Sequence, residues 1–258
     1  MAGCLADPTP GKNETMELQN VTALVTGANR GLGREFVQQL LAAGATRVYA
    51  AARDPAGLQE LVQAWPGRVQ PVLLDITRTD QIEAARTLCG DFGLLVNNAG
   101  VNRGRGFIAA DTLEHAQAEM ATNYLGTLAM CRAFAPQLGG GAIVNVLSIL
   151  AKVTLPAMGS LCASKAASLR MTEGVRAELA AQGTHVLAVM SGAIDTDMSR
   201  GFEGPKSSAA EVVGATLAAL AAGQEEVYVG DMPAWVNAAL AADAKALERE
   251  LGKYLPAA

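Results

Sequence analysis

Short apolar segments alternate with longer amphipathic segments along most of the chain. The short segments show little alternation of apolar and polar positions, as in strands buried on both faces of a parallel sheet. They are Val21–Thr26, Arg47–Ala52, Val69–Leu74, Leu94–Asn97, Ala142–Leu147, His185–Met190 and Val227–Val229. The longer segments predict helices at Leu32–Ala43, Thr79–Cys89, Leu113–Ala135, Gly159–Ala181 and Ala209–Ala222.

This order of strands and helices predicts an α/β fold. We expect a doubly wound, seven-stranded parallel sheet with right-handed crossovers and helices on both faces. No linker rich in Pro, Gly or Ser divides the chain, so we expect a flexible tail over residues 1–17 and a single domain over 18–258. The alanine-rich segment Met232–Leu251 predicts one or two further helices that pack on the domain or on another subunit.

Composition and charge narrow the class of protein. The chain has 258 residues, of which 50% are hydrophobic, so it can bury a large core. No run of eighteen apolar residues predicts a membrane helix, and the first twenty residues lack the apolar region of a secretion signal. The net charge of −5 is spread along the chain and disfavours binding to nucleic acid or anionic membranes. We therefore expect a cytoplasmic protein that acts on a small molecule.

The cysteines and histidines do not form a metal-binding pattern. Cys4, Cys89, Cys131 and Cys162 are widely spaced and match no zinc motif, so we expect reduced thiols. The two histidines, His115 and His185, are far apart in the sequence. We predict no metal site.

A glycine-rich turn follows the first predicted strand and leads into a helix. It reads Thr-Gly-Ala-Asn-Arg-Gly-Leu-Gly and includes Gly27, Asn29, Gly31, Leu32 and Gly33. In a dinucleotide-binding βα turn, glycines permit a tight bend and close approach of the backbone to a pyrophosphate at the helix N-terminus. The alternative is a glycine-rich turn without a ligand.

The second predicted strand indicates which nicotinamide cofactor would bind. An NAD site usually has a carboxylate there, whereas this strand ends in Ala52 followed by Arg53. Arg30 lies within the glycine turn, and two guanidinium groups suit a 2′-phosphate. The pattern favours NADP(H) over NAD(H), unless both arginines are solvated surface charges.

Six further motifs follow in order along the chain. They are Asp75 in Leu-Leu-Asp-Ile-Thr, Asn97–Gly100 in Asn-Asn-Ala-Gly, Asn123, Ser148, Lys165 in Cys-Ala-Ser-Lys-Ala-Ala, and Thr196 in Ser-Gly-Ala-Ile-Asp-Thr. Together with the glycine turn, they make the chain from about Val21 to Gly230 resemble the short-chain dehydrogenase/reductase family. The resemblance implies a Rossmann-type fold, an NADP(H)-dependent oxidoreductase activity and a homo-oligomer, tetramer or dimer.

The resemblance also implies roles for individual residues. Asp75 and Ile76 would contact the adenine, and Asn97, Ala99 and Gly100 would contact the adenosine and its ribose. Lys165 would bind the nicotinamide ribose. Ile194 and Thr196 would contact the nicotinamide carboxamide. Ser148 would bind the reacting oxygen, and Asn123 would hold a water in a proton relay. Ser191 and Gly192 stand where the family usually has Pro-Gly, near the expected nicotinamide edge. The alternatives are that Asn97 and Asn123 satisfy buried backbone groups and that Ser148 caps a turn.

One position departs from the family pattern in a way that affects catalysis. The family carries a tyrosine four residues before the lysine, on the same helix face, as its proton donor. Here Leu161 occupies that position, thirteen residues after Ser148 and four before Lys165. A leucine can neither donate nor accept a proton, so we expect ordinary carbonyl reduction to be impaired.

Several apolar residues surround the expected substrate position. Leu150, Val153, Leu155, Met158, Leu161, Met198 and Phe202 are expected to line it, although most could be ordinary core residues. An apolar pocket without a proton donor suits a bulky apolar carbonyl or an imine, because an iminium ion needs no proton when hydride arrives. The alternative is a catalytically impaired NADP(H)-binding pseudoenzyme or variant.

Overall fold

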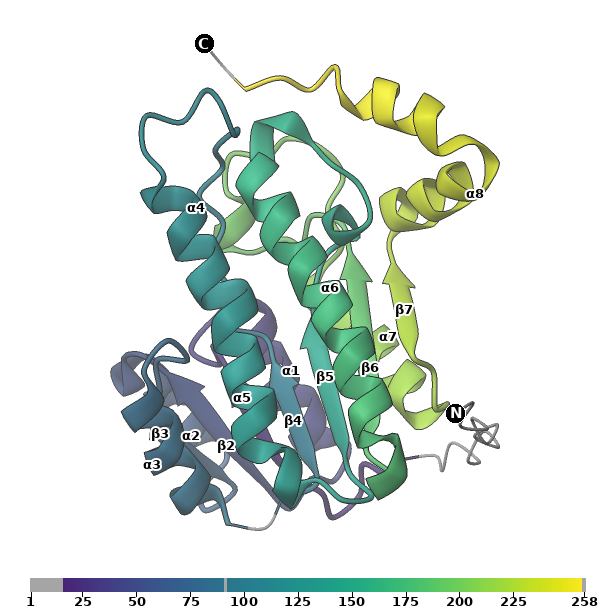
Figure 1. Ribbon diagram of the computed structural model, residues 1–258. Helices are drawn as coiled ribbons and strands as arrows, with labels where there is room; N and C mark the ends of the chain where they lie inside the picture. The colour runs from purple at the N-terminus through teal and green to yellow at the C-terminus, as the bar shows by residue number, and fades with distance from the viewer. Residues whose placement is uncertain (1–15, 91, 257–258) are drawn as a thin grey trace, which may run out of the picture.

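A seven-stranded parallel sheet forms the centre of the molecule (Figure 1). The structure is a computed structural model that describes residues 16–90 and 92–256. The strand order is β3-β2-β1-β4-β5-β6-β7, and every pair of neighbours is parallel, which confirms the predicted fold class. The tail expected over residues 1–17 falls almost entirely outside the described residues.

The strands lie where the apolar segments predicted them, within one residue at each end. They are β1 (Thr22–Thr26), β2 (Arg47–Ala52), β3 (Val69–Leu73), β4 (Leu94–Asn97), β5 (Ala142–Val146), β6 (His185–Ser191) and β7 (Glu226–Val229). The expectation that all are buried on both faces is wrong for the two edge strands. Leu73 in β3 is 54% exposed, and most of β7 is only partly buried. An edge strand has a neighbour on one side only, so its side chains are less completely covered.

Successive strand residues point to opposite faces, so the sheet has two cores. Ala23 and Val25 pack in one core with α1 (Gly31–Ala42) and α7 (Ala209–Ala221). Leu24 packs in the other core with α3 (Thr79–Cys89) and α5 (Thr127–Phe134). The long helix α6 (Gly159–Leu179) lies beside α5 on this second face (Figure 1).

The helix predicted over residues 113–135 is not one regular helix. It consists of α4 (Glu114–Glu119), a π-helical stretch at Met120–Gly126, α5, and a 3-10 turn at Ala135–Gln137. Gly126 packs tightly on the loop after β3, since a Cβ there would lie 2.8 Å from Cγ1 of Ile76. Asn123 lies inside the π-helical stretch, a feature that often occurs at functional sites.

The segment after β7 forms α8 (Asp231–Leu251), which is bent at Asp243. Asp243 has non-helical backbone angles (φ −156°, ψ 94°), and its carboxylate accepts hydrogen bonds from the amides of Lys245 and Ala246 at 3.0 and 2.9 Å. The Asp243 carboxylate thus caps the part of α8 that follows the bend. This confirms the prediction of one or two helices in the C-terminal segment. Val236 and Leu247 pack against Ile149, next to the candidate site.

Several short helices were not predicted. They are η1 (Pro55–Leu58), α2 (Gln59–Ala64), and the 3-10 turns Ile149–Ala151, Pro156–Met158 and Asp197–Ser199. A further 3-10 turn, Ala180–Gln182, ends the helix predicted over Gly159–Ala181. Three cysteines, Cys89, Cys131 and Cys162, are buried free thiols, whereas Cys4 lies outside the described residues. Across the parts of the chain that the structure describes, no helix has both the length and the apolar character to cross a membrane.

Candidate active site

A cavity of about 800 Å³ opens at the carboxyl ends of the central strands. Its lining runs from the turn after β1 to the loops after β4, β5 and β6. Strand order reverses direction between β1 and β4, and a ligand crevice is expected at such a switch point. The position of the cavity therefore follows from the sheet topology.

The glycine turn forms one wall of the cavity. Gly27 adopts a positive φ of 65°, and a Cβ on Gly33 would lie 2.2 Å from the carbonyl oxygen of Gly27. Only glycine at position 33 permits this close contact between α1 and the turn. Arg30 precedes α1 and makes no side-chain cap, so the first amides of the helix are left for a ligand.

The ends of β1 and β4 are joined by hydrogen bonds beneath this turn. The Thr26 hydroxyl accepts from the amides of Asn98 and Ala99, both at 3.0 Å, and Nδ2 of Asn98 donates to the carbonyl of Thr26 at 2.9 Å. Asn98 and Ala99 line the cavity, but Asn97 does not. Asn97 donates through Nδ2 to Asn145 at 2.9 Å in the interior. The Asn97 side chain therefore points into the interior, whereas its neighbour Asn98 lines the cavity.

Charged side chains gather at the β2–β3 side of the cavity. Arg30, Arg53 and Asp75 all line it, and Arg30 forms an ion pair with Asp197 at 3.1 Å. Burial acts to raise the pKa of Asp75, but hydrogen bonds from Thr77 and the nearby charge of Arg53 lower that pKa below its usual value. Asp75 is therefore an anionic acceptor at neutral pH, and Ile76 beside it offers an apolar contact.

Ser148 and Lys165 lie at the other end of the cavity. The Ser148 hydroxyl accepts from the amide of Leu150 at 3.2 Å, so it caps a 3-10 turn, and donates to the carbonyl of Ser191 at 3.3 Å. Nζ of Lys165 donates to the carbonyl of Val146 at 3.0 Å. Burial lowers the pKa of Lys165 to about 8. Near neutral pH this lysine can both carry and release a proton.

Asn123 lies behind the cavity wall and does not line it. Its Oδ1 accepts from the amide of Val101 at 2.8 Å, and its Nδ2 donates to the carbonyl of Val101 and to Ser164 Oγ, both at 3.0 Å. The side chain therefore ties the loop after β4 to α6. This geometry matches the alternative in which Asn123 satisfies buried backbone groups.

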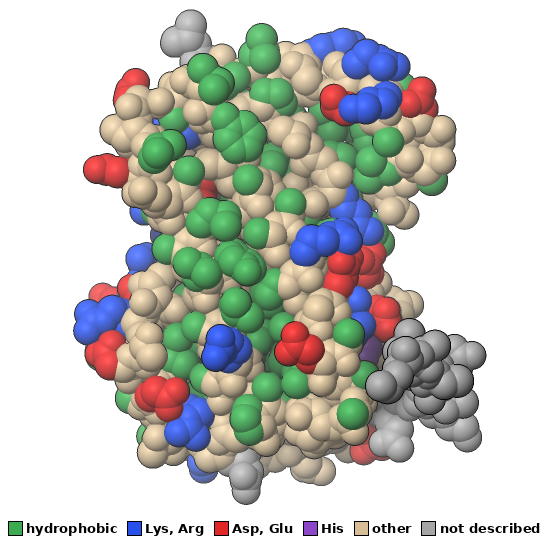
Figure 2. Space-filling view, in the orientation of Figure 1, with side chains coloured by type: hydrophobic (Ala, Val, Ile, Leu, Met, Phe, Trp, Pro, Cys, Tyr) green, Lys and Arg blue, Asp and Glu red, His purple; other side chains and the backbone are tan. Residues whose placement is uncertain are grey.

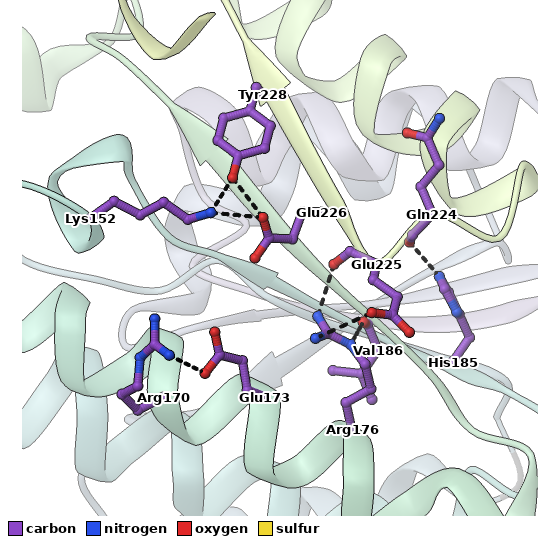
Figure 3. Close-up of polar contacts among 10 residues, drawn as sticks. All are labelled: Lys152, Arg170, Glu173, Arg176, His185, Val186, Gln224, Glu225, Glu226 and Tyr228. Carbon is purple, nitrogen blue, oxygen red and sulfur yellow. Dashed lines mark hydrogen bonds and ion pairs between the residues drawn. The ribbon is translucent and has the colours of Figure 1, made fainter. Parts of the chain in front are cut away.

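The cavity has no tyrosine in its lining, although all four tyrosines of the chain fall within the described residues. Tyr228 lies on β7, where its hydroxyl contacts Lys152 and donates to Glu226 at 2.6 Å (Figure 3). Burial and the contact with Glu226 raise the pKa of Tyr228. Tyr228 is thus part of a separate charged cluster.

The polar neighbours of Leu161 point elsewhere. Ser160 donates to Glu119 at 2.5 Å, Cys162 Sγ accepts from the amide of Leu155 at 3.3 Å, and Ser164 donates to the carbonyl of Leu161 at 2.8 Å. Leu161 itself is buried and lines the cavity. None of these three neighbours lines the cavity, so none replaces a phenol there.

Apolar side chains form the wall beside Lys165. Leu150 and Leu161 pack together with Leu155 and Met158, while Met198 (59% exposed) and Phe202 (44% exposed) form the rim. Val153 packs against this cluster but does not line the cavity. The other predicted residues that line it are Asn29, Leu32, Gly31, Gly100, Ser191, Gly192, Ile194 and Thr196.

The structure adds lining residues that the motifs did not identify. Among them are Val101, Asn102, Arg103, Gly104, Asp197, Arg200 and Met232. Most belong to the irregular loops after β4 and β6. The only sequence signal for these residues is that they follow the ends of predicted strands. Loops have no periodic pattern of apolar residues that would show which side chains face a cavity.

Comparison with known proteins decides the family. The sequence model described as short chain dehydrogenase matches residues 21–206. The chain belongs to the short-chain dehydrogenase family. D-erythrulose reductase of Gallus gallus is 35% identical over 195 residues, which are 74% of this chain and 78% of that protein. The probable oxidoreductase EphD of Mycobacterium tuberculosis is 32% identical over 205 residues, but these cover only 34% of EphD.

Solved structures of the family share the whole architecture. A short chain dehydrogenase from Burkholderia cenocepacia, crystallised in complex with NADP, is 50% identical with a TM-score of 0.88. The match covers 92% of this chain and 99% of that one. A short-chain dehydrogenase from Streptomyces avermitilis is 25% identical with a TM-score of 0.81, over 92% of this chain and 98% of that one.

Proposed function

We propose that this protein is an NADP(H)-dependent oxidoreductase that reduces a bulky apolar carbonyl or imine substrate without a tyrosine proton donor. The observation that carries the proposal is that one cavity, lined in part by the glycine turn, has an apolar wall that contains Leu161 and no phenol. The 50% identical relative that was crystallised with NADP supports the same cofactor.

The residues present fit NADP(H). Gly33 lets the start of α1 lie close to the backbone of Gly27. The backbone amides at the start of α1 have no side-chain cap, so they can bind a pyrophosphate. Among the described residues, Arg53 forms no ion pair or hydrogen bond, and the side chain of Arg30 is 68% exposed. Both guanidiniums are thus available to a 2′-phosphate. Asp75 and Ile76 would hold the adenine, and Lys165 would hold the ribose near the nicotinamide.

NADPH, when bound, supplies the hydride. The chain's own residues bind and orient the acceptor: Ser148 offers a hydroxyl to its reacting atom, and Leu150, Leu155 and Leu161 exclude water. An iminium ion needs no proton as hydride arrives, so it suits this site. A ketone needs a proton on its oxygen, and loss of a general acid lowers such rates by a factor of about 10²–10⁴.

Two measurements test this proposal. NADPH should raise the melting temperature of the purified protein more than NADH does, and NADPH should be oxidised in the presence of cyclic imines. Stabilisation by NADPH without any turnover across imines and ketones would instead favour the alternative, a pseudoenzyme. Absence of stabilisation would refute the cofactor assignment.

We also expect a homo-oligomer, dimer or tetramer. Figure 2 shows apolar side chains gathered on the face over α5 and α6, and Leu125 beside them is 54% exposed. Exposed apolar patches of this kind are typical of subunit contacts. Light scattering on the purified protein tests the expectation, and a monomer at micromolar concentration would refute it.

A further inference from the structure

The cavity lining carries more basic than acidic side chains, and they are not all at the cofactor end. Its lining holds five basic side chains (Arg30, Arg53, Arg103, Lys165 and Arg200) and two acidic ones (Asp75 and Asp197), although the whole chain carries a net charge of −5. Asp197 pairs with both Arg30 and Arg200, and Asp75 lies near Arg53. Among the described residues, the Arg103 guanidinium forms no ion pair, and only the backbone amide of Arg103 contacts a carboxylate, that of Glu119.

Arg103 lies at the substrate end of the cavity. It belongs to the loop after β4, and the neighbouring Asn102 contacts Met158 Sδ through Nδ2 at 4.0 Å. The loop turns sharply at Gly104, whose φ is +59°, and the Gly104 amide donates to Asn102 Oδ1 at 2.8 Å. Arg103 is therefore held beside the apolar wall, at the opposite end from the glycine turn.

A buried carboxylate fixes the backbone of Arg103. Glu119 on α4 is 0% exposed; its Oε1 accepts from the amide of Arg103 at 2.6 Å, and its Oε2 accepts from Ser160 Oγ at 2.5 Å. Ser160 is the second residue of α6, where the positive end of the helix dipole favours an anion. Burying a carboxylate costs several kcal/mol unless it is well bonded. The two hydrogen bonds of Glu119 therefore tie the backbone of the loop at Arg103 to the start of α6.

We propose that Arg103 binds a carboxylate on the substrate and that Glu119 positions Arg103 for this contact. The inference rests on the proposed function and narrows its substrate class to an apolar carbonyl or cyclic imine that carries an anionic group away from the reacting carbon. An unpaired guanidinium beside an apolar wall recognises such a molecule through a two-pronged, charge-assisted contact. Glu119 acts through the loop and does not touch the substrate.

The test compares a cyclic imine carboxylate, 3,4-dihydroisoquinoline-6-carboxylate, with its methyl ester. Calorimetry on the cofactor-free protein measures both dissociation constants, so the result does not depend on turnover. The carboxylate should bind at least about tenfold more tightly than the ester. Arg103→Ala should remove this preference and leave ester binding unchanged, and Arg103→Lys should retain part of it.

Arg105 provides the matched control. It is an exposed arginine two residues away that does not line the cavity, so Arg105→Ala should keep the full preference. For Glu119, the ratio of ester to carboxylate dissociation constants is the readout, because a general loss of stability would not change it. Glu119→Ala should lower this ratio, and Glu119→Gln should restore part of it.

The proposal is overturned if the two ligands bind equally, if neither binds, or if Arg105→Ala lowers the preference as much as Arg103→Ala. A failure of the proposed function would look different. In that case the carboxylate preference would persist in the binding assay, but neither ligand would cause oxidation of NADPH.

Discussion

Leu161 and Lys165 lie one helical turn apart on α6, and both side chains line the same cavity. The lysine is desolvated, which lowers its pKa to about 8, and no tyrosine lies in the lining with it. The wall of the cavity beside Lys165 is therefore apolar and contains no phenol. In our proposal, this arrangement separates cofactor binding from proton transfer.

Replacing Leu161 with tyrosine tests that separation. Leu161→Tyr would place a phenol one turn from the ammonium group of Lys165, and we expect reduction of an apolar ketone by NADPH to rise by a factor of about 10²–10⁴. Steady-state rates on one ketone provide the comparison. Leu161→Phe is the matched control, since it fills the same space without a hydroxyl and should give no rise. Equal rates for the two variants would refute our account of this centre.

Arg53 is expected to determine the choice of cofactor. Arg53→Ala should raise the dissociation constant of NADPH by a factor of about 10–100, because a charge-assisted contact to the 2′-phosphate is lost. The dissociation constant of NADH should not change, because NADH lacks that phosphate. Arg47→Ala, at the opposite end of β2, is the control and should alter neither value. Equal weakening of both cofactors would contradict the assignment.

Lys165 should make stability depend on pH in the alkaline range. Burial lowers its pKa from 10.5 to about 8, so the folded protein binds fewer protons than the unfolded chain between those values. The contribution of Lys165 to the free energy of unfolding therefore rises as pH rises from about 8 to 10.5. We expect Lys165→Met to be more stable than the parent by about 1–3 kcal/mol near pH 7, and by less near pH 10.

Urea denaturation of the cofactor-free proteins at the two pH values measures this difference. Lys152→Met is a suitable comparison, because Lys152 forms an ion pair with Glu226 at 2.9 Å. Loss of this ion pair should lower the free energy of unfolding, whereas Lys165→Met should raise it near pH 7. A Lys165→Met difference that is independent of pH would show that the pKa of Lys165 is not lowered.

Asn123 is expected to contribute mainly to stability. Asn123→Ala leaves the amide and carbonyl of Val101 without their partner, which should lower the free energy of unfolding by about 1–3 kcal/mol. Gln117→Ala, at an exposed position on α4, should change it by less than about 0.5 kcal/mol. If Asn123→Ala were as stable as the parent, its hydrogen bonds would not hold the loop.

The sequence predicted the strands and the glycine turn well, because the strands follow from periodicity and the turn from glycine geometry. Each buried apolar run became a strand, and the close contact between Gly33 and Gly27 is what the glycine turn requires. The pair Asn97 and Asn98 shows where pattern reasoning fell short. Adjacent residues at a strand end point to opposite sides, so only Asn98 reaches the cavity.

Features that depend on packing between distant segments could not be predicted. The π-helical stretch around Asn123 lies where Gly126 meets Ile76, which are far apart in sequence. The hydrogen bonds of Glu119 to Arg103 and Ser160 likewise join a helix, a loop and a second helix. Neither feature has a local sequence signal.

The central claim is that this protein moves a hydride to an apolar acceptor even though Leu161 replaces the usual phenol. The most direct measurement is a reaction of the purified protein with 3,4-dihydroisoquinoline and NADPH deuterated at the transferred position, followed by mass spectrometry of the amine. We predict an enzyme-dependent product that carries one deuterium on the reduced carbon. Absence of that product across cyclic imines and apolar ketones, despite saturable NADPH binding, would contradict the account.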